Sequence, residues 1–147
     1  MQSLFRAGPG APESAVPHKP EPAGGITFDA GGLIALDTRD RRVIALLARA
    51  SERGLRITIP ATALAQAMRS PVRQAWLSRL IRQPSTDLKA LNGPDATAVG
   101  LVLARTGTAD IADAHVVVCA QRGKQAVVTS DPGDLRRIAP QLDFIAV

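Results

Sequence analysis

The chain has 147 residues and a formal net charge of +5. Its composition, 46% hydrophobic and 21% charged, is typical of one soluble globular domain with a core of its own. Aromatic residues are scarce, with no Tyr, one Trp and three Phe, which argues against a nucleic-acid surface built on stacked rings. The basic balance suits a nucleic-acid partner, although a generic basic surface has the same balance. The single cysteine, Cys119, argues against a disulfide framework and a cysteine zinc site.

The amino-terminal residues 1–24 differ from the rest of the chain. They are rich in Pro, Gly and Ala and show no apolar period, so we expect a disordered tail or a misplaced start codon. One folded domain is expected over 25–147. The tail has no apolar segment of the signal-peptide kind, and no stretch is long enough to span a bilayer. Cytoplasm is therefore the expected compartment.

Strand and helix patterns alternate from residue 26 onward. In chain order we expect a strand at 26–30, a short helix at 33–36, a helix at 43–50, a strand at 55–59, a helix at 60–68, a helix at 72–81, an extended segment at 85–91, a helix at 95–105, a helix at 109–123, a strand at 125–130, a short helix at 132–138 and a strand at 143–147. Gly54 and Gly107 are expected to end the helices before them. Mostly apolar strands that alternate with helices predict an α/β fold in which helices cover both faces of a mostly parallel sheet.

Acidic residues follow two of the predicted strands. In parallel α/β folds, ligands bind outside the carboxyl ends of the strands, and Asp29 and Asp131 lie at two such ends. An ionised Asp beside a core is costly unless it is paired. A purely structural interpretation, in which acids only cap helices, leaves Asp29 unexplained. Asp110 and Asp113 lie three residues apart on one helix face, where acids also favour the positive end of the helix dipole.

The segment "SDPGD" around Asp131 has a competing structural explanation. Asp131 is a natural N-cap before a proline at the first helical position, and Asp134 follows three residues later. Asp134 and Thr129 are either outer metal ligands or residues that cap and orient the loop. For His115, a surface or half-buried histidine is favoured over a metal ligand.

Convergence of Asp29, Asp113 and Asp131 would create mutual repulsion, in which each carboxylate raises the pKa of the others. A divalent cation reverses that effect, and carboxylates are the ligands that Mg²⁺ or Mn²⁺ prefers. Acids that hold a metal on a basic protein suggest hydrolysis of phosphodiesters, with arginines holding the nucleic-acid strand.

Four segments, "TFDAGGLIAL", "IPATALAQAMR", "DAHVVVCA" and "VVTSDPGDL", occur in an order and at a spacing that resemble the PIN domain family, in particular VapC-type toxin ribonucleases of type II toxin–antitoxin systems. The resemblance runs from about Ile26 to the C-terminus. It implies a three-layer α/β/α PIN-like fold, a Mg²⁺- or Mn²⁺-dependent endoribonuclease that cuts RNA, often tRNA or rRNA, a homodimer, and neutralisation by a cognate VapB-type antitoxin. Asp29, Asp113 and Asp131 match the family's catalytic and metal-binding acids.

The chain departs from the family at Gln66, where the family usually has Glu. A carboxamide offers a neutral oxygen and cannot take a proton, so its presence should weaken metal binding. Our hypothesis is that Asp110, one helical turn before Asp113, supplies the missing charge. The main alternative is a catalytically weakened or inactive PIN-like module that binds RNA or a protein. A phosphoryl-accepting domain with Asp29 as nucleophile would need further acids after the first strand, and Gly31 stands where a phosphatase would have one.

Overall fold

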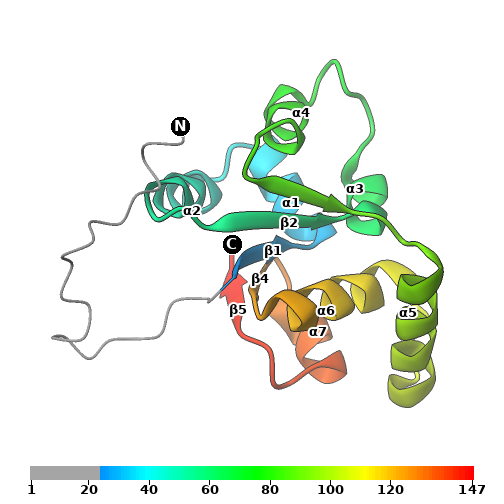
Figure 1. Cartoon of the computed structure of the whole chain (residues 1–147). Helices are drawn as coiled ribbons and strands as arrows, with labels where there is room; N and C mark the ends of the chain where they lie inside the picture. Colours follow the sequence, from blue (N-terminus) through cyan, green and yellow to red (C-terminus); the bar gives the residue numbers. More distant parts are fainter. Residues whose placement is uncertain (1–23) are drawn as a thin grey trace, which may run out of the picture.

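A five-stranded, all-parallel sheet forms the centre of the computed structural model, which describes residues 24–147 (Figure 1). The strands are β1 (Gly25–Phe28), β2 (Arg56–Pro60), β3 (Thr86–Lys89), β4 (Ala126–Thr129) and β5 (Phe144–Ala146), in the order β3-β2-β1-β4-β5. The expected α/β fold with a mostly parallel sheet is confirmed. The predicted tail lies, except for its last residue, outside the described residues.

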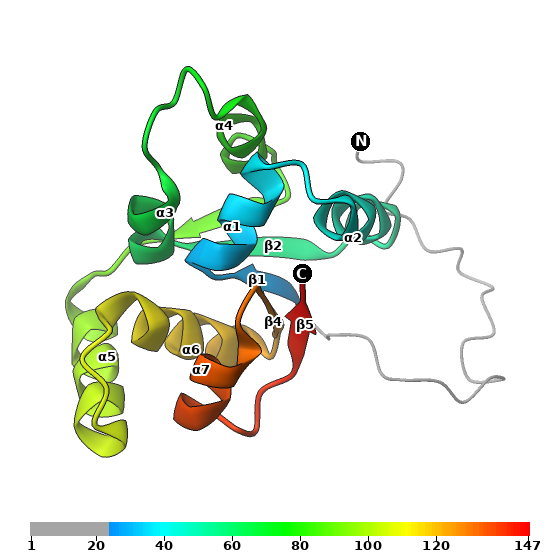
Figure 2. The ribbon, with the colours of Figure 1, turned by 180° about the vertical axis from the view of Figure 1, so that it is seen from behind.

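Seven helices flank the sheet within this part of the chain. They are α1 (Ala30–Asp37), α2 (Arg41–Glu52), α3 (Ala61–Ala67), α4 (Ala75–Ile81), α5 (Gly93–Thr106), α6 (Ile111–Gly123) and α7 (Pro132–Ile138). The two opposite views show α1, α2 and α4 on one face of the sheet and α6 and α7 on the other, with α5 packed outside α6 (Figures 1 and 2). Among residues 24–147, no helix is both long enough and apolar enough to cross a membrane.

The core lies on both faces of the sheet because the inner strands carry apolar side chains. Ile26 and Phe28 of β1 are almost fully buried, as are Ile59 of β2 and Val127 and Val128 of β4. Strands that are buried on both faces read as continuous apolar runs, which is the pattern from which the parallel sheet was predicted. The central position of β1 also fixes where Asp29 must lie, since that residue directly follows the strand.

The helix predicted over 72–81 begins later than expected, at Ala75. The side chain of Gln74 is buried, and its carbonyl oxygen accepts hydrogen bonds from the backbone N–H groups of Arg69 at 2.7 Å and Ser70 at 2.9 Å. These bonds hold the preceding residues in a turn that cannot continue as a helix. Apolar periodicity alone does not detect such a turn, because it depends on one buried amide.

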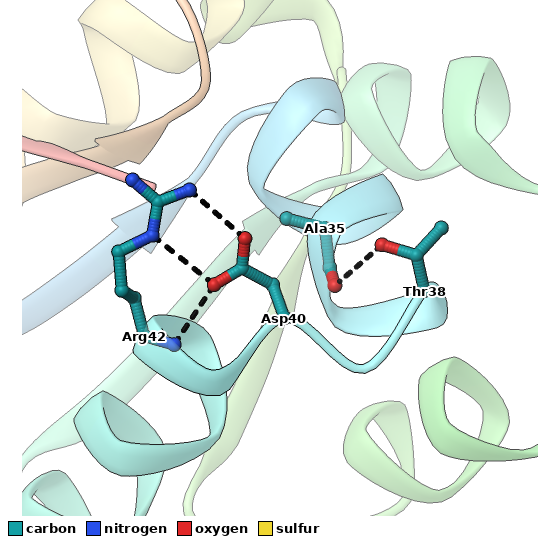
Figure 3. Close-up of polar contacts among 4 residues, drawn as sticks. All are labelled: Ala35, Thr38, Asp40 and Arg42. Carbon is teal, nitrogen blue, oxygen red and sulfur yellow. Dashed lines mark hydrogen bonds and ion pairs between the residues drawn. The ribbon is translucent and has the colours of Figure 1, made fainter.

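The end of α1 and the start of α2 are set by local hydrogen bonds (Figure 3). The Thr38 hydroxyl donates to the carbonyl of Ala35 at 3.1 Å, and Asp40 accepts from the backbone N–H of Arg42 at 2.8 Å as the N-cap of α2. The Arg42 guanidinium also binds Asp40 and holds the pKa of that carboxyl below its usual value. These contacts are exposed, so they define the corner rather than contribute much stability.

The predicted glycine stops are confirmed. Gly107 has a φ of 75° and caps α5, and Gly54, just beyond the end of α2, has a φ of 68°. Both lie in the left-handed region that glycine adopts without a steric penalty.

Candidate functional site

The predicted acids lie at the carboxyl edge of the sheet. Strands β1 and β4 are neighbours with Phe28 opposite Val128, and the backbone N–H of Asp29 donates to the Val128 carbonyl at 3.1 Å. This pairing places Asp29 beside the end of β4, from which the chain leads to Asp131. Helix α6, which packs on β1, β2 and β4, brings Asp113 of its first turn to the same edge.

Asp29 is the N-cap of α1. Its Oδ1 accepts a hydrogen bond from the backbone N–H of Gly32 at 2.7 Å, and its side chain is also hydrogen-bonded to Thr129. The residue is only 8% exposed. Burial raises the pKa of Asp29 and the charge of Asp131 raises it further, while the hydrogen bonds from Thr129 and Gly32 oppose that rise. We expected that helix capping would not account for Asp29. That expectation is wrong, because the Asp29 side chain caps α1.

The two glycines after Asp29 allow α1 to start directly against β4. A Cβ on Gly32 would lie 2.6 Å from the Val128 carbonyl oxygen, and a Cβ on Gly31 would lie 2.2 Å from the Ser130 hydroxyl. Real Cβ atoms do not approach other atoms this closely. The Ser130 hydroxyl can rotate away, but the Val128 carbonyl belongs to the backbone, so Gly32 is the position that requires glycine. The close packing keeps Asp29 next to the turn that carries Asp131.

Asp113 and Asp110 have different roles on α6. Asp110 is the N-cap, and its Oδ1 accepts from the backbone N–H of Asp113 at 2.9 Å. The structural explanation of Asp110 is thus confirmed. The carboxyl of Asp113 is partly buried, and burial, followed by the charge of Asp110 and then that of Asp29, raises its pKa to about 6. The charges of Asp134 and Asp131 add to this rise.

The carboxylate of Asp131 makes no capping hydrogen bond, although the residue occupies the N-cap position of α7. The prediction of a side-chain cap is therefore wrong, and this exposed carboxylate is left for other partners. The Thr129 hydroxyl accepts a hydrogen bond from the backbone N–H of Asp131 at 3.0 Å. Thr129 therefore orients the loop, which is one of the two roles predicted for it. Asp134 is exposed and pairs with Arg137 at 3.2 Å.

Gln66 lies on α3, the helix that packs between α1 and α6. Its side chain is exposed and makes no hydrogen bond with any residue in 24–147. On the same helix, Thr62 is hydrogen-bonded at 2.7 Å to Nδ1 of His115 from α6. His115 is fully buried, which corrects the expected surface or half-buried position. This histidine fixes α3 against α6, a role that the sequence pattern did not reveal.

The three acids suit a hard divalent cation by charge and by donor type. Asp29 and Asp113 have raised pKa values partly because neighbouring carboxylates repel them, and a bound cation would remove that repulsion. Asp131, which is exposed and uncapped, can turn toward such an ion. In the described residues 24–147, no three Asp, Glu, His or Cys side chains already form a set that could hold a metal ion.

A scan of protein-family models finds no match to this chain, and a search of characterised proteins finds none.

Proposed function

We propose that the protein is a Mg²⁺- or Mn²⁺-dependent endoribonuclease of the VapC toxin type, with Asp29, Asp113 and Asp131 as metal ligands and catalytic acids. The observation that carries the proposal is the mutual repulsion at the carboxyl edge. Burial raises the pKa of Asp113, and four neighbouring carboxylates raise it further, to about 6. Asp29 and Asp113, whose pKa values are raised, form no ion pair with a basic side chain in residues 24–147. Carboxyl groups with raised pKa values cluster at functional sites, which supports a site for a metal ion here.

Each acid has a distinct part in the proposed site. The buried carboxylate of Asp29 is fixed by Gly32 and Thr129, so it would define the position of the ion. Asp131 would close the site from its exposed turn, and Asp113 would complete the ligand set from α6. A divalent ion in such a site lowers the pKa of bound water and neutralises charge on the phosphate that is transferred. Because Asp113 must be ionised to bind a cation, activity should increase with pH through about 6.

The proposed partners are an RNA substrate, a second copy of the chain and a cognate antitoxin. One surface suits a protein segment, namely an apolar groove of about 340 Å³ that is lined by residues of α2, α4 and β2. Trp76 and Leu47 are among its apolar lining residues, and Arg39 and Arg79 each lie within 6 Å of the Trp76 ring. An apolar groove beside arginines suits an amphipathic segment with acidic residues.

The second candidate function is a PIN-like module that binds RNA or a protein without cutting. Gln66 favours it, since its neutral carboxamide leaves the acid group one charge below the family's number. The two functions differ in whether metal binding is coupled to cleavage.

Calorimetry with Mn²⁺ and an RNA-cleavage assay on wild type and Asp29→Asn test the proposal. Asparagine also caps helices, so α1 should still form in the variant. We expect wild type to bind Mn²⁺ and cut RNA, and the variant to do neither. The control is Asp143→Asn, which removes one exposed carboxylate near the amino end of β5. If neither wild type nor variant binds Mn²⁺ or cuts RNA, the binding module replaces the enzyme.

A further inference from the structure

A second concave site lies on the α6 side of the sheet. It is a polar pocket of about 460 Å³ between strands β2 and β3, the start of α5 and the end of α6. Asp113 and Arg122 are nine residues apart on α6, which places the pocket about 13 Å along the helix from the acids. This volume is in the range of about 300–1,000 Å³ that is common for small-molecule sites.

Three cations and two anions line this pocket. Arg56 binds Asp87 through two hydrogen bonds, at 3.1 and 2.5 Å, and Arg122 forms an ion pair with Asp95. Lys89 is exposed at the end of β3 and forms no ion pair within residues 24–147, although its charge helps the Arg56 guanidinium to lower the pKa of Asp87. The lining therefore carries a net charge of +1, and its one unpaired charge is an ammonium group.

The pocket also has buried polar groups. The hydroxyl-bearing Thr58 is 4% exposed and forms part of the lining. His115 lies one turn before the lining residue Cys119 on α6, so the two share a helix face. Nε2 of His115 is buried, and the imidazole also interacts with the backbone of the lining residue Ala90. This contact with Ala90 places His115 beside the pocket.

We propose that this pocket binds one nucleotide, with a phosphate oxygen at Lys89 and the unused N–H groups of Arg122, and with the sugar or base against Thr58. A net charge of +1 complements the single negative charge of a phosphodiester, and ammonium and guanidinium groups together are typical donors to phosphate. No aromatic ring lines the pocket, so hydrogen bonds rather than stacking would hold the nucleotide. The phosphate comes either from an RNA strand, a source that rests on the proposed function, or from a free mononucleotide.

Binding is measured on the full chain in EDTA, which prevents metal-dependent cleavage. Fluorescence anisotropy with a short single-stranded RNA and calorimetry with AMP distinguish the two sources. Lys89→Ala should weaken binding about tenfold, the effect expected for one charge-assisted hydrogen bond, and should reduce the slope of log affinity against log salt by about 0.7. The matched control is Arg49→Ala, which removes one exposed positive charge from α2. Amide chemical shifts in ¹⁵N-labelled protein report where AMP binds.

Weaker nucleotide binding in Lys89→Ala but not in Arg49→Ala supports the pocket. The phosphate then comes from RNA if AMP does not bind, and from either source if AMP binds. Equal effects of the two variants, shift changes confined to the acid edge, or no binding of either probe would overturn it. The proposed function is judged separately by Mn²⁺-dependent cleavage. If wild type cleaves RNA with Mn²⁺ but Lys89→Ala does not weaken nucleotide binding, the proposed nucleotide pocket is refuted and the proposed function is not.

Discussion

Replacement of Asp113 with asparagine should stabilise the metal-free protein above about pH 6 and abolish metal-dependent cleavage. The carboxyl of Asp113 has a pKa of about 6 in the folded protein, against 3.8 for an unperturbed aspartate, because burial and the charge of Asp110 disfavour ionisation. Folding at neutral pH therefore either moves an already ionised carboxylate into an unfavourable position or takes up a proton. Asparagine has nearly the same shape and no charge, so it removes this cost.

The size of the effect follows from the shift. A difference of about two pKa units corresponds to about 3 kcal/mol if it is fully expressed in stability. The side chain is only partly buried, so solvent screens part of the repulsion, and the positive end of the α6 dipole favours the ionised form. We therefore expect asparagine to increase the free energy of unfolding by about 1–2 kcal/mol at pH 8.

The sign depends on pH. Below pH 3.8 the carboxyl of Asp113 is mostly protonated in both the folded and the unfolded chain, so its pKa shift does not change the free energy of unfolding. As the pH rises toward 6, the unfolded chain ionises first, so wild type loses stability relative to the variant. Urea unfolding in EDTA at pH 4, 6 and 8 should show a difference that grows and then levels off. Added Mn²⁺ should stabilise wild type and not the variant.

Asp143→Asn is the control, since the side chain of Asp143 is exposed and near the amino end of β5. It should change stability little at every pH. A variant Asp113→Asn that is no more stable than wild type at pH 8, or a difference that does not vary with pH, would refute the electrostatic argument. A variant that still cleaves RNA with Mn²⁺ would remove Asp113 from the catalytic set.

Three further predictions test the site and the contacts that support it. Gln66→Glu should tighten Mn²⁺ binding by restoring a carboxylate, and an unchanged calorimetric titration would place this residue outside the metal shell. Gly32→Ala should destabilise the fold by about 2 kcal/mol or more in urea unfolding, because the added Cβ would meet the Val128 carbonyl. Gly100→Ala is the matched control: its Cβ would meet open space, so it should stabilise α5 by about 0.5–1 kcal/mol. Equal effects of these two would contradict the packing argument. Thr129→Val should lower Mn²⁺-dependent cleavage about tenfold while the protein stays folded. The reason is that Asp29 loses a hydrogen bond that favours its ionised form. Unchanged cleavage would show that the Thr129 hydroxyl is not needed.

Much of the fold was predictable because the signals are local. The apolar runs at β1, β2 and β4 identified buried parallel strands, and Gly107 marked the end of α5 through its backbone conformation. The late start of α4 was not predictable, since it depends on Gln74 reaching back to the backbone of Arg69 and Ser70. A buried polar side chain that organises a turn leaves no periodic pattern in the sequence.

The acids of the site were predictable as a group, but their individual contacts were not. Their placement followed from the rule that strand carboxyl ends meet at one edge, which applies to Asp29 and Asp131. Capping depends on side-chain rotamers that a sequence does not specify. As a result, Asp131 lacks the cap bond that its "SDPGD" context suggests, and Asp29 makes one that its context did not suggest.

The difference in capping also suggests how the acids divide the task of binding an ion. Asp29 is fixed by Gly32, by Thr129 and by burial, so its carboxylate costs little entropy to order. Asp131 is exposed and uncapped, so it can adjust to the ion that Asp29 positions. In the proposed site, a fixed ligand would set the location of the ion, and an adjustable one would allow the coordination distance to be reached. In the proposed site, the neutral Gln66 would offer a bound ion one charge fewer than a glutamate, so replacing it with glutamate should change metal affinity more than folding stability.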